Sequence, residues 1–259
     1  YEYRGMGASA WYLLRGDYSN WPDRPFYRDV IARYGEPALD VGCGTGRLVL
    51  DYLSAGVDVD GVDNSPEMLA ICREKAHALG VTPTLYEQQM QSLDLPRRYR
   101  TIFVPSSTFL LLTEPAGAAE AMRRFYAHLL PGGVLVMRFM VLWPGQRMPE
   151  DGVWSAWFVS GERARPDDGV IVRRHQRARY HLAAQLQDTE DRYELVADGE
   201  VISTEEHQRT PATRWYTTEQ STAVYAAAGF TDVRAVREFT FDPVTSDDRV
   251  WTIFGTRPL

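Results

Sequence analysis

A glycine-rich turn between an apolar strand and a helix constrains this chain more than any other feature. Residues 38–48 read Ala-Leu-Asp-Val-Gly-Cys-Gly-Thr-Gly-Arg-Leu, so a short apolar run leads into glycines at 42, 44 and 46. Glycine accepts positive φ angles and lets a ligand approach the backbone where a Cβ atom would clash. The helix that follows presents unpaired N–H groups at its first turn. The segment therefore predicts a Rossmann-type nucleotide site.

The spacing of these glycines excludes two other nucleotide motifs. A dinucleotide fingerprint needs its third glycine at position 47, where Arg47 stands, and a P-loop needs a Gly-Lys-Ser/Thr sequence that the chain lacks. Asp40 precedes the turn and can accept a hydrogen bond from a cationic ammonium group. Asp63 ends the second predicted strand, seventeen residues past Gly46, where an acid can hold both hydroxyls of a ribose.

Alternating strand and helix patterns surround this turn. Apolar runs predict strands over 38–41, 57–63, 84–87, 99–105 and 133–141, and helical spacing predicts helices over 26–34, 47–55, 66–79 and 116–130. Ser65 is a suitable N-cap, with Pro66 at the first helical position of the helix that follows. The alternation predicts βαβ units, and hence a mainly parallel sheet with helices on both faces.

The pattern changes to hairpin alternation after Trp143. Strand-like stretches over 154–159, 170–180, 185–195 and 201–207, with hairpin turns expected at 188–191 and 197–199, predict an antiparallel insert of three or four strands. A helix over 218–228 and strands over 233–239 and 249–256 close the chain.

The predicted fold class is α/β, a Rossmann-like and mainly parallel seven-stranded sheet with an antiparallel β insert after strand five. The expected organisation is an aromatic N-terminal lid and first helix (1–35), a nucleotide-binding core (36–142), the insert as a cap (143–213) and a return to the core sheet (214–259).

Composition excludes several functions. Hydrophobic residues make up 44% and charged residues 24%, which excludes global disorder. The formal net charge is −7, so we expect no nucleic-acid partner, because phosphate backbones bind basic faces. The chain has no transmembrane-length apolar run and no signal-peptide pattern, so we expect no membrane partner and a cytoplasmic location. The missing initiator Met indicates a trimmed or truncated N-terminus.

Cysteine and lysine usage adds little chemistry. Cys43 and Cys72 lie far apart with no metal-ligand pattern beside them, so we expect neither a metal site nor a disulfide framework. Lys75 is the one lysine among 28 basic residues, which we attribute to genome composition.

The segment ALDVGCGTGRL followed by VDGVDNSPEMLAICREK resembles class I S-adenosylmethionine-dependent methyltransferases. The resemblance covers roughly residues 24–142, and the stretch 214–230 matches the family's usual return to the sheet. It implies S-adenosylmethionine as cofactor and methyl transfer to a nitrogen, oxygen or carbon atom of a small molecule, such as a secondary metabolite. The layout also resembles, more weakly, sugar N-methyltransferases and glycine N-methyltransferase, in which an aromatic N-terminal segment and an antiparallel insert cover the active site.

The resemblance implies roles for individual residues. The turn would line the methionine part of the cofactor with Gly42, Cys43, Gly44 and Gly46, above Asp40, while Asp63 would hold the ribose. The residues implied around the adenine are Asn64, Met68, Gln89, which replaces the family's usual acid, and Met90. Pro105 and Ser106 would sit against the cofactor after the fourth strand, and Tyr12 and Tyr27 would act as aromatic lids.

The insert supplies the predicted acceptor-binding residues Trp143 and Trp154, with Arg214 just beyond it. His207 is the predicted general base, because it alternates with Glu205 on a strand and both face one side; the alternative is a solvated hairpin face. The basic run 173–179 could meet an acidic substrate or form a solvated strand face.

Several alternatives stay open. The insert could serve as a homodimer surface instead of a cap. The bound cofactor could support another reaction, such as cyclisation or decarboxylation, or the chain could be a non-catalytic S-adenosylmethionine-binding regulator. The sequence identifies neither the acceptor nor the atom methylated.

Overall fold

The computed structural model describes residues 3–16, 20–143 and 147–259. The chain divides into two compact units, a small unit of residues 1–18 and 142–215 and a large unit of residues 19–141 and 216–259. Parts of the predicted N-terminal lid (1–2 and 17–19) and of the predicted insert (144–146) lie outside the described residues.

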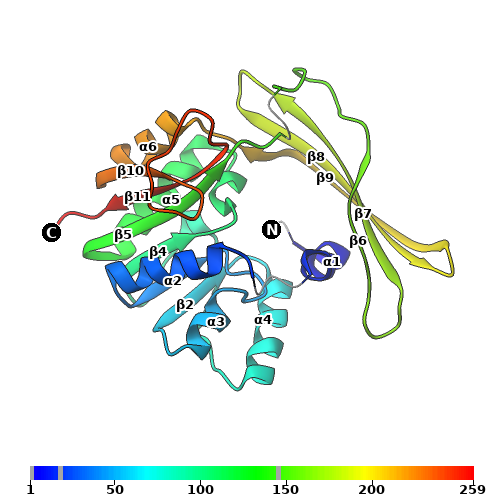
Figure 1. Ribbon diagram of the computed structural model, residues 1–259, viewed down its shortest axis with the longest axis horizontal. Helices are drawn as coiled ribbons and strands as arrows, with labels where there is room; N and C mark the ends of the chain where they lie inside the picture. Colours follow the sequence, from blue (N-terminus) through cyan, green and yellow to red (C-terminus); the bar gives the residue numbers. More distant parts are fainter. Residues whose placement is uncertain (1–2, 17–19, 144–146) are drawn as a thin grey trace. The chain divides into compact units, whose positions relative to one another are not determined.

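The large unit contains a seven-stranded sheet in the order β10-β11-β5-β4-β1-β2-β3 (Figure 1). Its parallel strands are β1 (Ala38–Val41), β2 (Val59–Asp63), β3 (Leu85–Glu87), β4 (Tyr99–Val104) and β5 (Leu129–Met140). β11 (Val250–Thr256) pairs antiparallel with β5, and β10 (Thr231–Arg237) pairs antiparallel with β11. This confirms the predicted fold class. The carboxyl ends of the parallel strands form the edge where ligands of open α/β sheets bind.

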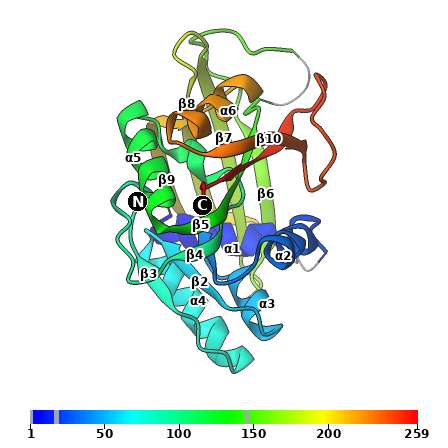
Figure 2. The ribbon, with the colours of Figure 1, turned by 90° about the vertical axis from the view of Figure 1, so that its left-hand side faces the viewer.

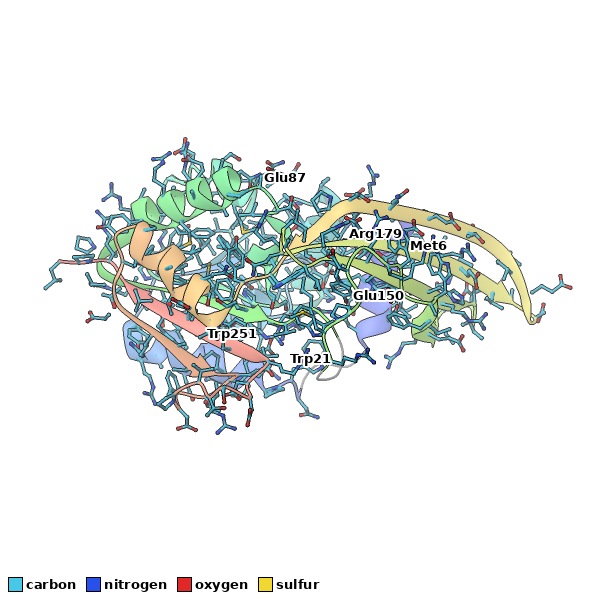
Figure 3. All side chains as sticks on the ribbon, turned by 90° about the horizontal axis from the view of Figure 1, so that it is seen from above. Met6, Trp21, Glu87, Glu150, Arg179 and Trp251 are labelled. Atoms are coloured by element: carbon cyan, nitrogen blue, oxygen red, sulfur yellow. The ribbon has the colours of Figure 1, made fainter. Side chains whose placement is uncertain are left out.

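Helices cover both faces of this sheet (Figure 2). The core on one face joins α2 (Asp23–Tyr34), α3 (Val49–Ser54) and α4 (Pro66–Leu79) to Phe103, Val136 and Phe254 of the strands. Trp251, labelled in Figure 3, lies three residues before Phe254 on β11 and so points to the opposite face. There its Nε1 donates to Ser221 Oγ of α6 (Thr218–Ala227) at 3.0 Å, and α5 (Pro115–His128) contacts both α6 and β5.

The small unit is a four-stranded antiparallel sheet with a helix against one face. Its strands are β6 (Phe158–Ala164), β7 (Ile171–His181), β8 (Leu186–Ala197) and β9 (Glu200–Arg214), in that order. The helix α1 (Gly5–Arg15) packs Ala10 against Val172 of β7 and Tyr193 of β8. These strand residues share a face, because Arg174, two residues past Val172, pairs with Tyr193 in register.

The turn predicted at 188–191 is wrong, because these residues lie inside β8. Asp188 is bound by Arg179 of β7 at 2.6 Å, and Asp191 is bound by Arg174 of the same strand at 2.7 Å. Asp residues are common in turns, but cross-strand ion pairs keep these two within a strand. The chain reverses instead at 182–185, where Gln185 has a φ of 55°.

The strand predicted at 154–159 is also placed wrongly, because the regular ladder begins only at Phe158. Ser155 does bond to β7: its N–H donates to the Ala178 carbonyl at 2.8 Å, and its Oγ accepts from the Ala178 N–H at 3.1 Å. The serine side chain thus takes the place of a backbone carbonyl, which interrupts strand pairing at this point.

Candidate functional site

The three glycines of the turn after β1 have different surroundings. Their φ angles are 75° at Gly42, 54° at Gly44 and 84° at Gly46. A Cβ atom added at Gly42 would lie 2.6 Å from Thr108 Cγ2, and one at Gly46 would lie 2.5 Å from Cys72 Sγ, so packing requires glycine at both. A Cβ atom at Gly44 would meet nothing within 4 Å. The backbone of the turn is therefore open to a ligand at Gly44.

Asp63 ends β2 and reaches back to this turn. Its Oδ2 accepts a hydrogen bond from the Gly44 N–H at 2.8 Å, and its Oδ1 accepts one from the Ser65 N–H at 2.9 Å. Burial raises the pKa of Asp63 above its ordinary value, and these backbone hydrogen bonds oppose the rise. Each carboxylate oxygen has a second lone pair. Asp63 can therefore fix the turn and still accept from ribose hydroxyls.

Asp40 offers a buried acceptor that no described residue satisfies. It is 1% exposed on β1, and its Oδ1 has no hydrogen-bond partner in the described part of the chain. Burial raises the pKa of Asp40 to about 7; Arg47 opposes the rise, although its guanidinium is bound to Asp23 at 2.8 and 2.5 Å. An unsatisfied buried acceptor is costly. A cationic donor such as the ammonium of an amino acid would remove that cost.

The two tyrosines predicted as lids lie in different units. Tyr27 on α2 is fully buried, and its ring stacks on Phe103 with centroids 5.2 Å apart. Phe103 pairs with Asp40 in register, which places Tyr27 on the same face of the sheet as Asp40. The Tyr27 hydroxyl has no partner among the described residues, and burial raises its pKa, so it stays a neutral donor. Tyr12 lies on α1 in the small unit and is exposed.

The remaining residues predicted around the cofactor differ in access. Cys43 is buried, and its Sγ would lie 2.9 Å from a Cβ atom added at Gly61, so the side chain packs inward and only its backbone faces the turn. Met68 is buried on α4 and donates its N–H to Ser65 Oγ at 3.2 Å. The residues with at least partial exposure are Asn64, Gln89 and Met90, the last of which begins the short 3-10 helix η1 (Met90–Ser92).

A strained turn follows β4. The sequence did not predict the arginine that stabilises it. Ser106 and Ser107 both have left-handed backbones, with φ of 56° and 59°, ahead of the 3-10 helix η2 (Thr108–Leu111). Arg138 of β5 donates from Nη1 to Ser107 Oγ at 3.0 Å and pairs with Glu238 at 2.6 Å. Ser106 is exposed and Pro105 is buried. Arg138 is the one arginine in the apolar run of β5, and this was the sequence feature that could have revealed its role at the turn.

His207 and Glu205 share a face of β9 and together bind the first turn of α1. His207 Nε2 lies 2.5 Å from Glu205 Oε1, and the Glu205 carboxylate accepts from the Met6 N–H at 3.1 and 3.2 Å. Figure 3 labels Met6 in the first turn of this helix. Arg4, the helix's own N-cap residue, makes no side-chain cap. These contacts give His207 a structural task, while its catalytic role stays a prediction.

The predicted acceptor residues lie in the small unit, where each has different contacts. Trp143 packs edge-on against Tyr180 and Trp215, with centroids 6.0 and 5.4 Å apart. Arg214 donates from Nη1 to the Ala184 carbonyl at 2.9 Å.

The basic run of β7 is paired with acids from the neighbouring strands. Arg177 bonds Glu190 from Nε at 2.6 Å, as Arg179 bonds Asp188, and Trp154 lies over both guanidinium groups at 4.9 and 4.7 Å. Arg179 is labelled in Figure 3. This pairing favours a self-neutralised strand face over a surface for an acidic substrate.

No group of three or more His, Cys, Asp or Glu in the described part of the chain is arranged to hold a metal ion. None of the helices described has both the length and the apolar character needed to cross a bilayer.

Methyltransferases match the part of the chain that contains the glycine turn and its neighbouring strands. A family model described as a methyltransferase domain matches residues 38–133. A Geobacillus sp. (strain WCH70) protein named as a methyltransferase is 30% identical over 155 residues, which are 56% of this chain and 61% of that protein. A Streptomyces fradiae dTDP-3-amino-3,6-dideoxy-alpha-D-glucopyranose N,N-dimethyltransferase is 33% identical over 38% of this chain and 37% of its own. A Campylobacter lari carboxy-S-adenosyl-L-methionine synthase is 30% identical over 40% of this chain and 44% of that protein. The chain thus spans less than two thirds of the length of each of these relatives.

Solved structures match over nearly the whole chain. The CcbJ methyltransferase from Streptomyces caelestis superposes with a TM-score of 0.73 at 23% identity, over 97% of this chain and 96% of that one, and so shows the fold. The amino pentose methyltransferase CalS10 from Micromonospora echinaspora, solved with S-adenosylmethionine bound, has a TM-score of 0.64 at 25% identity over 98% of each chain.

Proposed function

We propose, because a methyltransferase domain model matches residues 38–133, that the chain is a class I S-adenosylmethionine-dependent methyltransferase and that it methylates an amino group of a small molecule. The observation that carries the proposal is the turn after β1, where open space over Gly44 adjoins the carboxylate of Asp63. Of the predicted nitrogen, oxygen and carbon nucleophiles we select nitrogen, because two relatives are named for amino sugars.

The residues around the turn fit this cofactor. S-adenosylmethionine supplies an electrophilic methyl group, so the protein's task is to align the nucleophile and to exclude water. In our proposal Asp63 accepts from the ribose hydroxyls and Asp40 accepts from the ammonium of the methionine part. The Tyr27 hydroxyl donates to the carboxylate of that part. Asp40 Oδ1 and the Tyr27 hydroxyl are among the buried side-chain atoms that have no hydrogen-bond partner within the described chain, which supports this assignment.

We assign acceptor choice to the segment between β5 and α6. The chain leaves the large unit after the carboxyl end of β5 and returns to it at Tyr216. Because ligands bind at that edge of an open α/β sheet, a segment that starts there can reach them. Once an acceptor is known, Trp154→Ala and His207→Ala should raise its KM or lower turnover and leave affinity for S-adenosylhomocysteine within about twofold. A changed oligomer mass with unchanged acceptor kinetics would instead support a homodimer surface, which exposed Phe158 and Val159 on β6 would suit.

Incubation with methyl-labelled S-adenosylmethionine tests the reaction. The acceptors are amino sugars, free and nucleotide-linked, with matched sugars that carry a hydroxyl in place of the amine. We expect label in the amines and an equal amount of S-adenosylhomocysteine. Label in the hydroxyl sugars alone would contradict the choice of nitrogen.

A second candidate is another reaction of the bound cofactor, which the similarity to a carboxy-S-adenosyl-L-methionine synthase favours. Cofactor consumed without acceptor labelling would support it, and binding without consumption would support a regulator.

A further inference from the structure

We propose that Lys75 is a positioning residue of the cofactor site, which fixes the glycine turn to α4; the inference rests on the proposed function. Lys75 Nζ donates to Thr45 Oγ1 at 3.3 Å and to the Thr45 carbonyl at 3.4 Å. Thr45 is buried between Gly44 and Gly46, so Lys75 holds the centre of the turn. Nothing in the family resemblance assigns this residue a role.

Cys72 holds the same turn one helical turn earlier. Residues at i and i+3 of a helix lie on one side, which places Cys72 and Lys75 together on α4. The Cys72 Sγ leaves no space for a Cβ atom at Gly46, so the helix packs directly against that glycine. Three glycines with positive φ make the turn's backbone freer than residues with side chains would at the same positions. α4 restricts that freedom through packing at Gly46 and hydrogen bonds at Thr45.

A lysine at this position needs an explanation. Burial lowers the pKa of Lys75 to about 8, with a smaller opposing effect from the Cys72 thiol. Burial therefore disfavours the charged ammonium, and an apolar side chain of similar length would avoid that cost. The hydrogen bonds to Thr45 compensate the cost. The role we infer is to keep Gly44 in the conformation that admits the cofactor.

Calorimetric titration with S-adenosylhomocysteine tests the role. Lys75→Met should weaken binding by about fivefold or more, because two hydrogen bonds to the turn are lost. Lys75→Arg should stay within about threefold of the wild type, since a guanidinium keeps donors for Thr45. Arg73→Met, at an exposed position of the same helix, is the matched control and should change nothing.

Thermal unfolding separates positioning from a general structural role. Lys75→Met removes both the desolvation cost of the partly buried amine and the hydrogen bonds that compensate it, so its unfolding temperature should change little while its affinity falls. Weaker binding accompanied by a matching loss of stability, or unchanged binding, would overturn the proposal. If the wild type itself fails to bind S-adenosylhomocysteine, the proposed function fails, which is a distinguishable result.

Acetylation offers a second test, because Lys75 is the one lysine of the chain. The amine attacks the carbonyl of the N-hydroxysuccinimide ester of acetic acid, and N-hydroxysuccinimide and a proton leave. The product amide has one N–H and no charge. Protein acetylated at Lys75, as located by mass spectrometry, should lose affinity as Lys75→Met does. Lys75→Arg treated in the same way has no lysine to acetylate and should keep its affinity; equal loss in this control would contradict the proposal.

Discussion

Replacement of Asp63 by Ala removes one carboxylate that we assign to two tasks. In the protein without ligand it accepts from the Gly44 N–H at 2.8 Å and from the Ser65 N–H at 2.9 Å. With the cofactor bound we expect it also to accept from both ribose hydroxyls. A hydrogen bond to a charged group contributes about 1.5–3 kcal/mol, so loss of the two ribose bonds amounts to about 3–6 kcal/mol. Each 1.4 kcal/mol is about tenfold in Kd, so affinity should fall about 100-fold or more.

Calorimetry with S-adenosylhomocysteine measures this loss directly. Asp63→Asn keeps one acceptor oxygen without the charge and should fall between the wild type and Asp63→Ala. Asp60→Asn is the matched control, because Asp60 is a buried acid of the same strand whose Oδ2 accepts from the Tyr99 hydroxyl at 2.9 Å. This control should lose stability and keep its Kd within about twofold. A folded Asp63→Ala variant with unchanged affinity would refute the placement of the ribose.

The contacts described above support four further predictions. Affinity for S-adenosylhomocysteine should rise between about pH 6 and pH 8 as Asp40, whose pKa burial raises to about 7, ionises to meet the ligand's ammonium; Asp40→Asn should flatten the profile, and a flat wild-type profile would contradict the assignment. In the free protein the raised pKa of Asp40 has the opposite effect on stability. The folded state holds a proton on Asp40 that the unfolded state has lost, so the free energy of unfolding declines as pH rises towards 7, and Asp40→Asn should remove that decline in urea titrations. Glu205→Ala should speed hydrogen exchange at the first turn of α1 about fivefold or more, since the helix loses its cap at Met6; unchanged exchange there would show that the cap is dispensable. Arg138→Met should cost about 1–3 kcal/mol of unfolding free energy and be less than additive with Glu238→Gln, whereas full additivity would mean that the pair does not interact.

The sequence predicted the large unit well, because its determinants are local. The strand before the glycines was predicted at its observed bounds, and so was α4, which Ser65 caps and Pro66 begins. Asp63 follows its strand directly, so its place beside the turn could be inferred from chain order alone. What the sequence did not reveal at the site were contacts between distant segments. The bond from Arg138 to Ser107 and the hydrogen bonds from Lys75 to Thr45 join residues that are about thirty positions apart.

The small unit was harder to predict for the same reason. Asp188 and Asp191 have turn character when their own strand is considered alone, and only the arginines of β7 show why they remain in β8. The alternation of Glu205 and His207 correctly predicted a shared face. Their partner, the first turn of α1, lies almost two hundred residues away in the sequence. Periodicity indicates which face a side chain takes and does not identify what covers that face.

Titration of the wild type and Gly44→Val with S-adenosylhomocysteine measures whether the cofactor binds over the glycine turn. Gly44 has open space above it and a φ of 54°, so a branched side chain there would fill the space assigned to the cofactor and resist the backbone conformation. We expect one saturable site per wild-type chain and no measurable binding to Gly44→Val, with most of the fold retained by circular dichroism. A wild type that does not bind, or a folded Gly44→Val variant that binds equally well, would show that the cofactor does not lie over Gly44.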